Sequence, residues 1–232
     1  MIDKFYHGTS TFYLDLIRQK GLGTINPNFE YKFLELLCFL FLLAEYTLTD
    51  NKEYLKVRDT TKAMAFQEPL IREISGRKVK FNFRHKNIYV SYGETRAVIY
   101  AINTEFGSEI LSRAILIYRL LKNKIGSVII PSHLDLGDID AISQNKFEPI
   151  VVRVDNLTPN ELLTEYGESS VDSLELIQHM KNTLDFKSFH NEVQFMNFEL
   201  LKPIEPNRLK FYKVLHYGLP ADPNFNWELK EI

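Results

Sequence analysis

The sequence predicts an α+β fold in which helices and strands are mixed irregularly along a single domain covering residues 1–232. Three observations support this prediction. Runs with strand-like alternation recur from the start of the chain to its end, and helical segments separate them at irregular intervals. The chain contains no internal repeat and no Pro/Gly/Ser-rich linker that would divide it.

The individual elements follow from hydrophobic spacing and from helix-end signals. Strands are expected where apolar residues alternate or β-branched residues gather, over 2–6, 77–83, 87–91, 127–132, 149–154, 192–198 and 208–217. Helices are expected where apolar residues recur with helical spacing or a cap occurs, over 11–20, 29–48, 59–74, 94–106, 108–123 and 160–167. The family resemblance that is given below implies that the helices at about 29–74 are a helical insertion within the predicted domain.

Helix-end signals support two of these helices. Thr9 or Ser10 can cap the helix over 11–20, and Gly21 can end it. The sequence "TPNE" at 158–161 has the form of a capping box with proline at the first helical position. A helix is therefore expected to begin there.

The composition gives no global preference for a charged partner. The 28 basic and 30 acidic residues leave a formal net charge of -2, so nucleic acid could be attracted only by a local patch. The single cysteine, Cys38, lies in an apolar segment and is expected to be a buried hydrophobic residue. The six histidines have no ligand spacing, and no metal site is expected.

The most apolar segment, residues 33–48, is expected to be a buried helix. Glu35 and Glu45 interrupt it, and its uncharged part is too short to cross a bilayer. The N-terminal residues lack the pattern of a secretion signal. We therefore expect a cytoplasmic protein without membrane contact.

Three short segments contain the candidate chemistry. They are "YHGTS" at 6–10, "NIYVSYGETRAVIYA" at 87–101 and "NEVQFMNFELLKPIEPNRL" at 191–209. In this order they resemble the ADP-ribosyltransferase superfamily, in particular the His-Tyr-Glu branch that includes diphtheria toxin and the poly(ADP-ribose) polymerases. The resemblance implies split mixed or antiparallel β-sheets with flanking helices, and NAD as the ADP-ribose donor.

The resemblance assigns the first segment to NAD binding. His7 takes the place of the triad histidine, which hydrogen-bonds the adenine-side ribose. The main chain of Gly8 takes the place of the group that binds the carboxamide of nicotinamide, and Thr9 completes the motif. A glycine suits this position because no Cβ obstructs the approach of the ligand to the backbone.

The other two segments supply the remaining candidates. By resemblance, Tyr89 is the triad tyrosine, Tyr100 is the second aromatic ring against nicotinamide, and Glu192 is the triad glutamate. Ala97 departs from the pattern, because poly(ADP-ribose) polymerases have a carboxamide-binding serine three residues before the second tyrosine. His190 lies two residues before Glu192, where arginine-modifying toxins have Glu or Gln, and this disfavours that subclass.

The chemistry of NAD cleavage agrees with these residue types. Positive charge builds on the ribose as nicotinamide leaves, so one carboxylate near the ribose can stabilise the transition state. Two aromatic rings can sandwich the cationic nicotinamide by stacking and cation–π attraction. Orientation, more than nucleophilic strength, is what such a site must supply.

A basic segment at 76–86 is the candidate acceptor-binding region. Lys78, Lys80, Arg84 and Lys86 are concentrated there, just before Tyr89. The simpler interpretation is the solvated face of a strand. The alternative is a patch that binds phosphates, which favours RNA or DNA over protein as the acceptor.

The sequence therefore predicts a mono-ADP-ribosyltransferase that acts on a macromolecule. A stand-alone toxin of a toxin–antitoxin or phage-defence system, with an antitoxin protein as partner, is the setting that the resemblance implies. Two alternatives stay open at this point. They are an NAD-dependent RNA 2′-phosphotransferase, and a domain that binds NAD or ADP-ribose without catalysis.

Overall fold

The computed structural model describes residues 4–74, 77–81, 83, 87–134, 136–222 and 224–232. It confirms the α+β class, with helices beside an antiparallel seven-stranded sheet. The chain divides into two compact units. We call residues 1–25, 87–107 and 147–232 the sheet unit, and residues 26–86 and 108–146 the helical unit.

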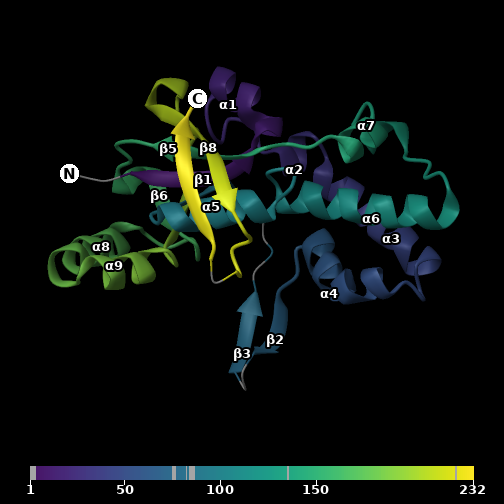
Figure 1. The fold of residues 1–232 in the computed structure, drawn as a ribbon, viewed down its shortest axis with the longest axis horizontal. Coiled ribbons are helices and arrows are strands. Elements are labelled where there is room, and N and C mark those ends of the chain that lie inside the picture. Colours follow the sequence, from purple (N-terminus) through teal and green to yellow (C-terminus); the bar gives the residue numbers. More distant parts are fainter. Residues whose placement is uncertain (1–3, 75–76, 82, 84–86, 135, 223) are drawn as a thin grey trace. The chain divides into compact units, whose positions relative to one another are not determined.

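The sheet unit contains all seven strands of the larger sheet, in the order β6-β7-β4-β1-β5-β8-β9. Figure 1 labels β1, β5, β6 and β8 of this sheet. Every neighbouring pair is antiparallel. The strands are β1 Phe5–Ser10, β4 Tyr89–Ser91, β5 Pro149–Val154, β6 Leu162–Thr164, β7 Asn197–Leu200, β8 Leu209–Tyr217 and β9 Asn226–Glu231. The α-helices of this unit are α1 Leu14–Lys20, α5 Glu94–Asn103, α8 Val171–Thr183 and α9 Phe186–Val193.

Helices cover both faces of this sheet. On one face, α5 contacts β1, β5 and β8, and Val98 and Ala101 pack with Val151 and Val214 in a buried cluster. On the other face, the ring of Phe5 meets Phe198 and Tyr92 edge to face, both at 5.6 Å. Tyr92 in turn contacts Phe189 of α9 at 6.1 Å, so this apolar chain fixes α9 to the sheet.

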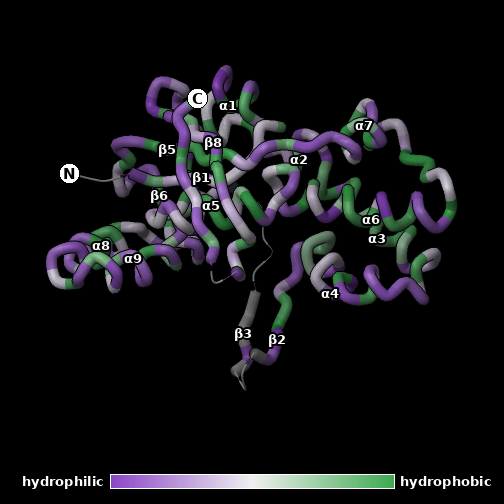
Figure 2. The backbone as a smooth tube through the Cα atoms, viewed as in Figure 1, coloured by the Kyte–Doolittle hydropathy of each residue, from purple (hydrophilic) through white to green (hydrophobic). Residues whose placement is uncertain are grey.

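The helical unit is built around α3 Phe33–Thr47, α4 Lys52–Phe66 and α6 Glu109–Ile125. Hydrophobic and hydrophilic residues alternate along α6 (Figure 2), as expected for a helix that is buried on one side. The remaining elements are α2 Pro27–Glu30, α7 Ile139–Gln144 and a ribbon of β2 Leu70–Ile74 with β3 Arg77–Phe81. None of the helices among the described residues combines the length and apolar character needed to cross a membrane.

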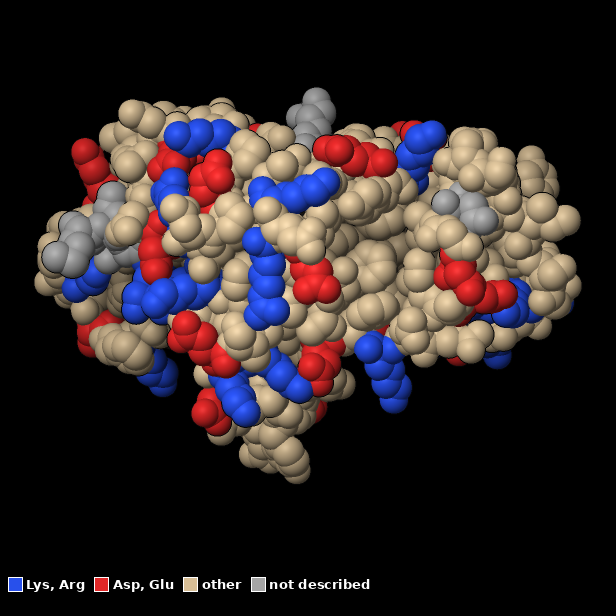
Figure 3. Space-filling view, turned by 90° about the horizontal axis from the view of Figure 1, so that it is seen from above, with Lys and Arg blue, Asp and Glu red and all other residues tan. Residues whose placement is uncertain are grey.

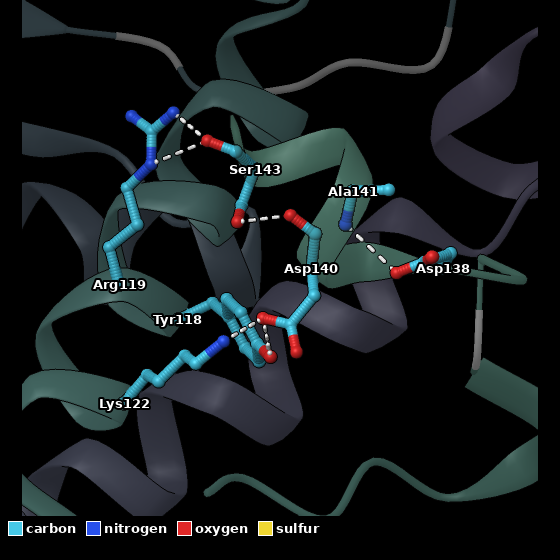
Figure 4. Close-up of polar contacts among 7 residues, drawn as sticks. All are labelled: Tyr118, Arg119, Lys122, Asp138, Asp140, Ala141 and Ser143. Carbon is cyan, nitrogen blue, oxygen red and sulfur yellow. Dashed lines mark hydrogen bonds and ion pairs between the residues drawn. The ribbon is translucent and has the colours of Figure 1, made fainter. Parts of the chain in front are cut away.

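Polar contacts hold α7 against α6 (Figure 4). The hydroxyl of Tyr118 donates to Oδ1 of Asp140 at 2.7 Å, and Lys122 forms an ion pair with the same oxygen. Arg119 donates to the carbonyl of Ser143 at the end of α7. Asp138 caps α7 by accepting a hydrogen bond from the backbone further along the helix. A six-residue helix is too short to be stable alone, so these contacts determine its position.

Several sequence-based elements differ from the structure. The helix expected over 59–74, with a kink or an end near Pro69, is α4, which begins earlier at Lys52 and ends at Phe66. Gln67 adopts a left-handed conformation, and β2 follows Pro69. The capping box of Thr158 and Glu161 is present, but it opens a single 3-10 turn before β6, which pairs with β7. No strand forms over 127–132, where the described residues are irregular.

The helical insertion expected at about 29–74 is part of a larger unit. The helical unit also includes residues 108–146, so it draws on two separate stretches of the chain. The helix expected over 29–48 is divided into α2 and α3, because Lys32 between them has a left-handed backbone. The C-terminal strand β9 was missed by the sequence analysis.

Candidate active site

A break in the pairing of β1 with β4 is the central feature of the candidate site, and we call this break the opening. β1 is paired with β5 along its whole length, from Phe5 with Val154 to Ser10 with Pro149. Its ladder with β4 includes one residue pair, Tyr6 with Ser91. The two strands therefore separate directly after Tyr6, at the His-Gly motif.

Backbone directions place the main chain of Gly8 in this opening. In an antiparallel ladder, the N–H and C=O groups of successive residues point alternately to the two neighbouring strands. The amide of Thr11 donates to the carbonyl of Glu148 at 2.9 Å, on the β5 side. Because this direction alternates along β1, the N–H and C=O groups of His7 also point to β5, and those of Gly8 point to β4.

The imidazole of His7 spans the opening. Its Nδ1 lies 2.8 Å from the carbonyl oxygen of Tyr89, and a carbonyl only accepts, so Nδ1 carries the proton. Burial lowers the pKa of His7, because the charged ring would lose its hydration, and the hydrogen bond to Tyr89 opposes this only in part. The ring is neutral at pH 7, and its Nε2 can accept a hydrogen bond.

Gly8 also allows α5 to lie directly on β1. A Cβ at this position would be 2.0 Å from the carbonyl oxygen of Ala97 and 2.9 Å from the amide nitrogen of Ala101. Any larger residue would push the helix away from the strand. Glycine is thus required for packing on one side, while its main chain faces the opening.

Tyr89 and Glu199 lie side by side on one face of the sheet. They are directly opposite each other in the β4–β7 ladder, so their side chains share a face. The hydroxyl of Tyr89 donates to Oε2 of Glu199 at 3.3 Å, and the amide of Asn87 donates to Oε1. Both donors are neutral, so they orient the half-buried carboxylate without cancelling its charge.

Tyr100 lies on the β4 side of α5. Successive residues of an α-helix are rotated by about 100° around its axis. The side chain of Tyr100 therefore lies about 60° around the axis from that of the sheet-facing Ala97, on the side opposite Val98. Val98 packs toward β5 and β8 through Val151 and Val214, which places the opposite flank toward β4. The side chain of Tyr100 is half-buried.

The prediction that Glu192 begins a strand is wrong. Glu192 lies in α9 with an exposed side chain. The helix forms here because Asp185 caps it, accepting hydrogen bonds from two backbone amides, and because Phe189 packs against the sheet. The structure therefore brings Glu199 beside Tyr89, and it leaves Glu192 on a helix surface.

Asn87 and Glu199 were missed by the sequence analysis. The signal for Glu199 is the alternation in "NFEL" at 197–200, where Phe198 and Leu200 are buried and Glu199 faces the other way. Asn87 precedes Tyr89 by two residues, so in an extended chain the two side chains point to the same face. Nothing in the residue type of Asn87 distinguishes it from an ordinary turn residue.

Thr9 does not contribute its hydroxyl to this group. The side chain is 1% exposed, and Oγ1 donates to the carbonyl of Gly107 at 3.1 Å. Gly107 has a φ of +68°, and a Cβ there would lie 2.5 Å from that hydroxyl. Thr9 therefore fixes the end of the α5 segment to β1, and the candidate site contains its neighbours His7 and Gly8.

A second polar group lies on the same face of the sheet, over β1, β5 and β8. Burial and the adjacent carboxylate of Glu94 raise the pKa of Tyr6. Arg153 pairs with Asp155 through Nε and Oδ1 at 2.9 Å, and its guanidinium lies over the ring of Tyr212 at 5.6 Å. These charges are paired among themselves, which is typical of a structural role.

The predicted acceptor-binding residues belong to the helical unit. Lys78 is exposed on β3, opposite Glu73 of β2, and Lys80 lies in the same strand. Arg84 and Lys86 lie outside the described residues. Basic and acidic side chains are interspersed on the face that Figure 3 draws, in agreement with the small formal net charge.

Similarity to known proteins adds nothing to this geometry. Comparisons of the chain with protein-family models, with curated proteins and with solved structures found no match. Function is therefore inferred from the arrangement of residues in the sheet unit.

Proposed function

We propose that the sheet unit is the catalytic core of a mono-ADP-ribosyltransferase, a glycosyltransferase that moves ADP-ribose from NAD to a macromolecule. The observation that supports this most directly is the contact of Nδ1 of His7 with the carbonyl oxygen of Tyr89, whose hydroxyl donates to Glu199 across the β4–β7 ladder. Glu199 takes the catalytic role that the sequence assigned to Glu192. Glu199 lies within β7, and the segment "KPIEPN" follows this strand.

The opening offers complementary groups for nicotinamide. The N–H and C=O of Gly8 match the oxygen and the amino group of the carboxamide. Tyr89 and Tyr100 supply two aromatic rings, and cation–π attraction to the charged pyridinium ring contributes about 0.5–2 kcal/mol for each contact. Nε2 of His7 can accept a hydrogen bond from a ribose hydroxyl.

Glu199 acts when the glycosidic bond breaks. The electron pair of the bond between C1′ and the nicotinamide nitrogen moves to that nitrogen, and the ribose becomes positively charged. The carboxylate of Glu199, held by Asn87 and Tyr89, stabilises this charge in place. A nucleophile of the acceptor then bonds to C1′ and releases its proton to water.

Nucleic acid is the acceptor that we favour. The support is the basic segment with Lys78, Lys80, Arg84 and Lys86. Neutralising Lys78, Lys80 and Arg84 together should weaken modification and flatten its salt dependence, since each lost phosphate contact removes about one released counterion. Unchanged modification at every salt concentration would show that this segment is only a solvated surface.

Such an activity fits a stand-alone toxin of a toxin–antitoxin or phage-defence system. NAD and nucleic acids are present in every cell, so an uncontrolled transferase would damage its own host. An antitoxin protein that blocks the site is therefore part of the proposal.

The proposal is tested by incubating the protein with adenylate-labelled NAD and cell lysate, followed by protease, DNase or RNase in parallel. We expect nicotinamide release, and label that a nuclease removes. Label removed by protease alone would assign the acceptor to protein. Loss of a 2′-phosphate from RNA without retained ADP-ribose would indicate a phosphotransferase, and NAD binding without nicotinamide release would indicate a non-catalytic domain. Either of these last two results would refute the transferase.

A further inference from the structure

Arg113 of α6 is a half-buried cation in the helical unit, and it makes no ion pair within the described part of the chain. Its Nη1 donates to the carbonyl of Val57 at 3.2 Å and to Oγ1 of Thr61 at 3.0 Å. The Thr61 hydroxyl itself donates to the Val57 carbonyl at 2.8 Å, so its oxygen is the acceptor for Arg113. Both acceptors, which lie on α4, are neutral.

Burial therefore leaves the charge of Arg113 poorly compensated. Burial lowers the pKa of its guanidinium, and the negative charge of Glu109 opposes that shift only in part. A cation that is removed from water without an anionic partner destabilises the fold. Such a buried cation is expected at a site where a bound anion compensates its charge.

Arg58 on the same helix α4 shows the usual solution. Its Nε donates to Oε1 of Glu45 at 2.7 Å and its Nη2 to Oε2 at 2.5 Å, a two-point contact between guanidinium and carboxylate. The pKa of Glu45 is lowered to about 2, chiefly by the hydrogen bond from Arg58. Arg58 thus has an anionic partner within the protein, in contrast to Arg113.

A second guanidinium reaches the same stretch of α4. Arg72 of β2 is exposed, and its Nη2 donates to Oγ1 of Thr60, which directly precedes Thr61. Arg72 and Arg113 thus contact neighbouring residues of α4, and repulsion from the positive charge of Arg72 also lowers the pKa of Arg113. An anion bound between them would replace this repulsion with attraction.

We propose that the guanidinium groups of Arg72 and Arg113, which Thr60 and Thr61 hold in position, form a binding site for a phosphate group. Guanidinium groups bind phosphate oxygens through parallel hydrogen bonds, and two of them from different elements can grip different edges of one tetrahedral anion. The hydrogen bonds of Arg113 to α4 use Nη1, so Nε and Nη2 of this half-buried residue can donate to the ligand. The phosphate can come from a free nucleotide or from a nucleic-acid backbone.

The site lies entirely within the helical unit, so it does not depend on the proposed NAD chemistry. Lys78 is not part of it, because the register of the β2–β3 ribbon places Arg72 and Lys78 on opposite faces. The site is thus distinct from the basic face that the sequence indicated.

Binding is tested on the full chain by calorimetry with inorganic phosphate, adenosine monophosphate and a ten-nucleotide single-stranded RNA. Arg72→Gln should weaken binding about 10-fold, because it removes one charge-assisted contact. Arg72 is exposed, so this variant should fold normally. Arg113→Met, which keeps the apolar part of the side chain, should weaken binding at least as much.

Arg58→Gln is the matched control, because it removes the same charge from α4 at a residue that already has a carboxylate partner. It should leave binding within about 2-fold of the wild type. If no probe binds, or if Arg58→Gln weakens binding as much as Arg72→Gln, the proposal is wrong. RNA that binds more tightly than the mononucleotide identifies a nucleic-acid backbone as the source, and equal affinity identifies a free nucleotide.

Discussion

Glu161 and Glu199 are two glutamates of the sheet unit that differ in how their charge is compensated. Glu161 is 4% exposed, and it accepts hydrogen bonds from the amide and the hydroxyl of Thr158 at 2.9 Å each. Arg208 contacts both of its oxygens, at 2.7 and 3.3 Å. Glu199 is half-buried and held by an amide and a phenol.

The difference separates a structural carboxylate from a catalytic candidate. The hydrogen bond from Arg208 is the main reason that the pKa of Glu161 is lowered to about 2. Within the described residues, no lysine or arginine pairs with Glu199. A carboxylate that is oriented by neutral donors keeps its charge available for a cation that forms during the reaction.

The largest expected effect follows from removing the charge of Glu199. Glu199→Gln keeps the size and one hydrogen-bonding oxygen, so NAD binding measured by calorimetry should change little. Turnover, measured as nicotinamide release, should fall on the order of 10²–10³-fold, because the developing positive charge loses its electrostatic partner. Near-normal turnover in a folded variant would remove Glu199 from the proposed mechanism.

The same substitution at Glu161 should affect stability instead. A carboxylate whose pKa is lowered on folding stabilises the protein above its unfolded pKa near 4.5, and this contribution is lost as pH falls toward about 2. Between pH 7 and pH 3 the wild type should lose about 2 kcal/mol from this group, measured by urea unfolding. Glu161→Gln should lack this part of the decline, and its turnover per folded molecule should stay normal. An unchanged pH profile of stability in the variant would contradict the assignment.

Asn87→Ala tests whether neutral donors position Glu199. Loss of one hydrogen bond to a charged group should lower kcat about 10-fold and leave the KM for NAD nearly unchanged. Asn87→Gln, which can still donate, should recover part of the activity. A rise in KM without a change in kcat would instead place Asn87 in substrate binding.

The sequence allowed much of this fold to be predicted, and the errors have physical causes. The pattern at 87–101 predicted β4 and α5, because strand alternation and helical spacing there agree with the packing on β1. The capping box at Thr158 was recognised, but the helix that it predicted is overridden by pairing of β6 with β7. Local signals do not contain that tertiary contact.

The candidate site was also predictable in part, where local motifs contain its residues. His7, Gly8 and Tyr89 belong to short motifs, and the structure brings them together at the opening of the sheet. Glu199 depends on strand register across 110 residues, which no local pattern specifies. The hydrogen-bonding role of Asn87 depends on the same register.

The smallest expected effect is that of Glu192→Gln, and it distinguishes the two glutamates of the last motif. Glu192 is exposed on α9, and it lies near the C-terminal end of that helix, where the negative end of the helix dipole does not favour a carboxylate. Removing its charge should therefore change the free energy of unfolding by less than about 0.5 kcal/mol. Nicotinamide release should stay within about 2-fold of the wild type, because Glu199 and not Glu192 is paired with Tyr89 in the sheet. Parallel measurements on Glu192→Gln and Glu199→Gln, at equal protein and NAD concentrations, decide between the two. A loss of turnover in Glu192→Gln with normal turnover in Glu199→Gln would restore the glutamate that the sequence motif indicated and would require α9 to approach the bound ribose.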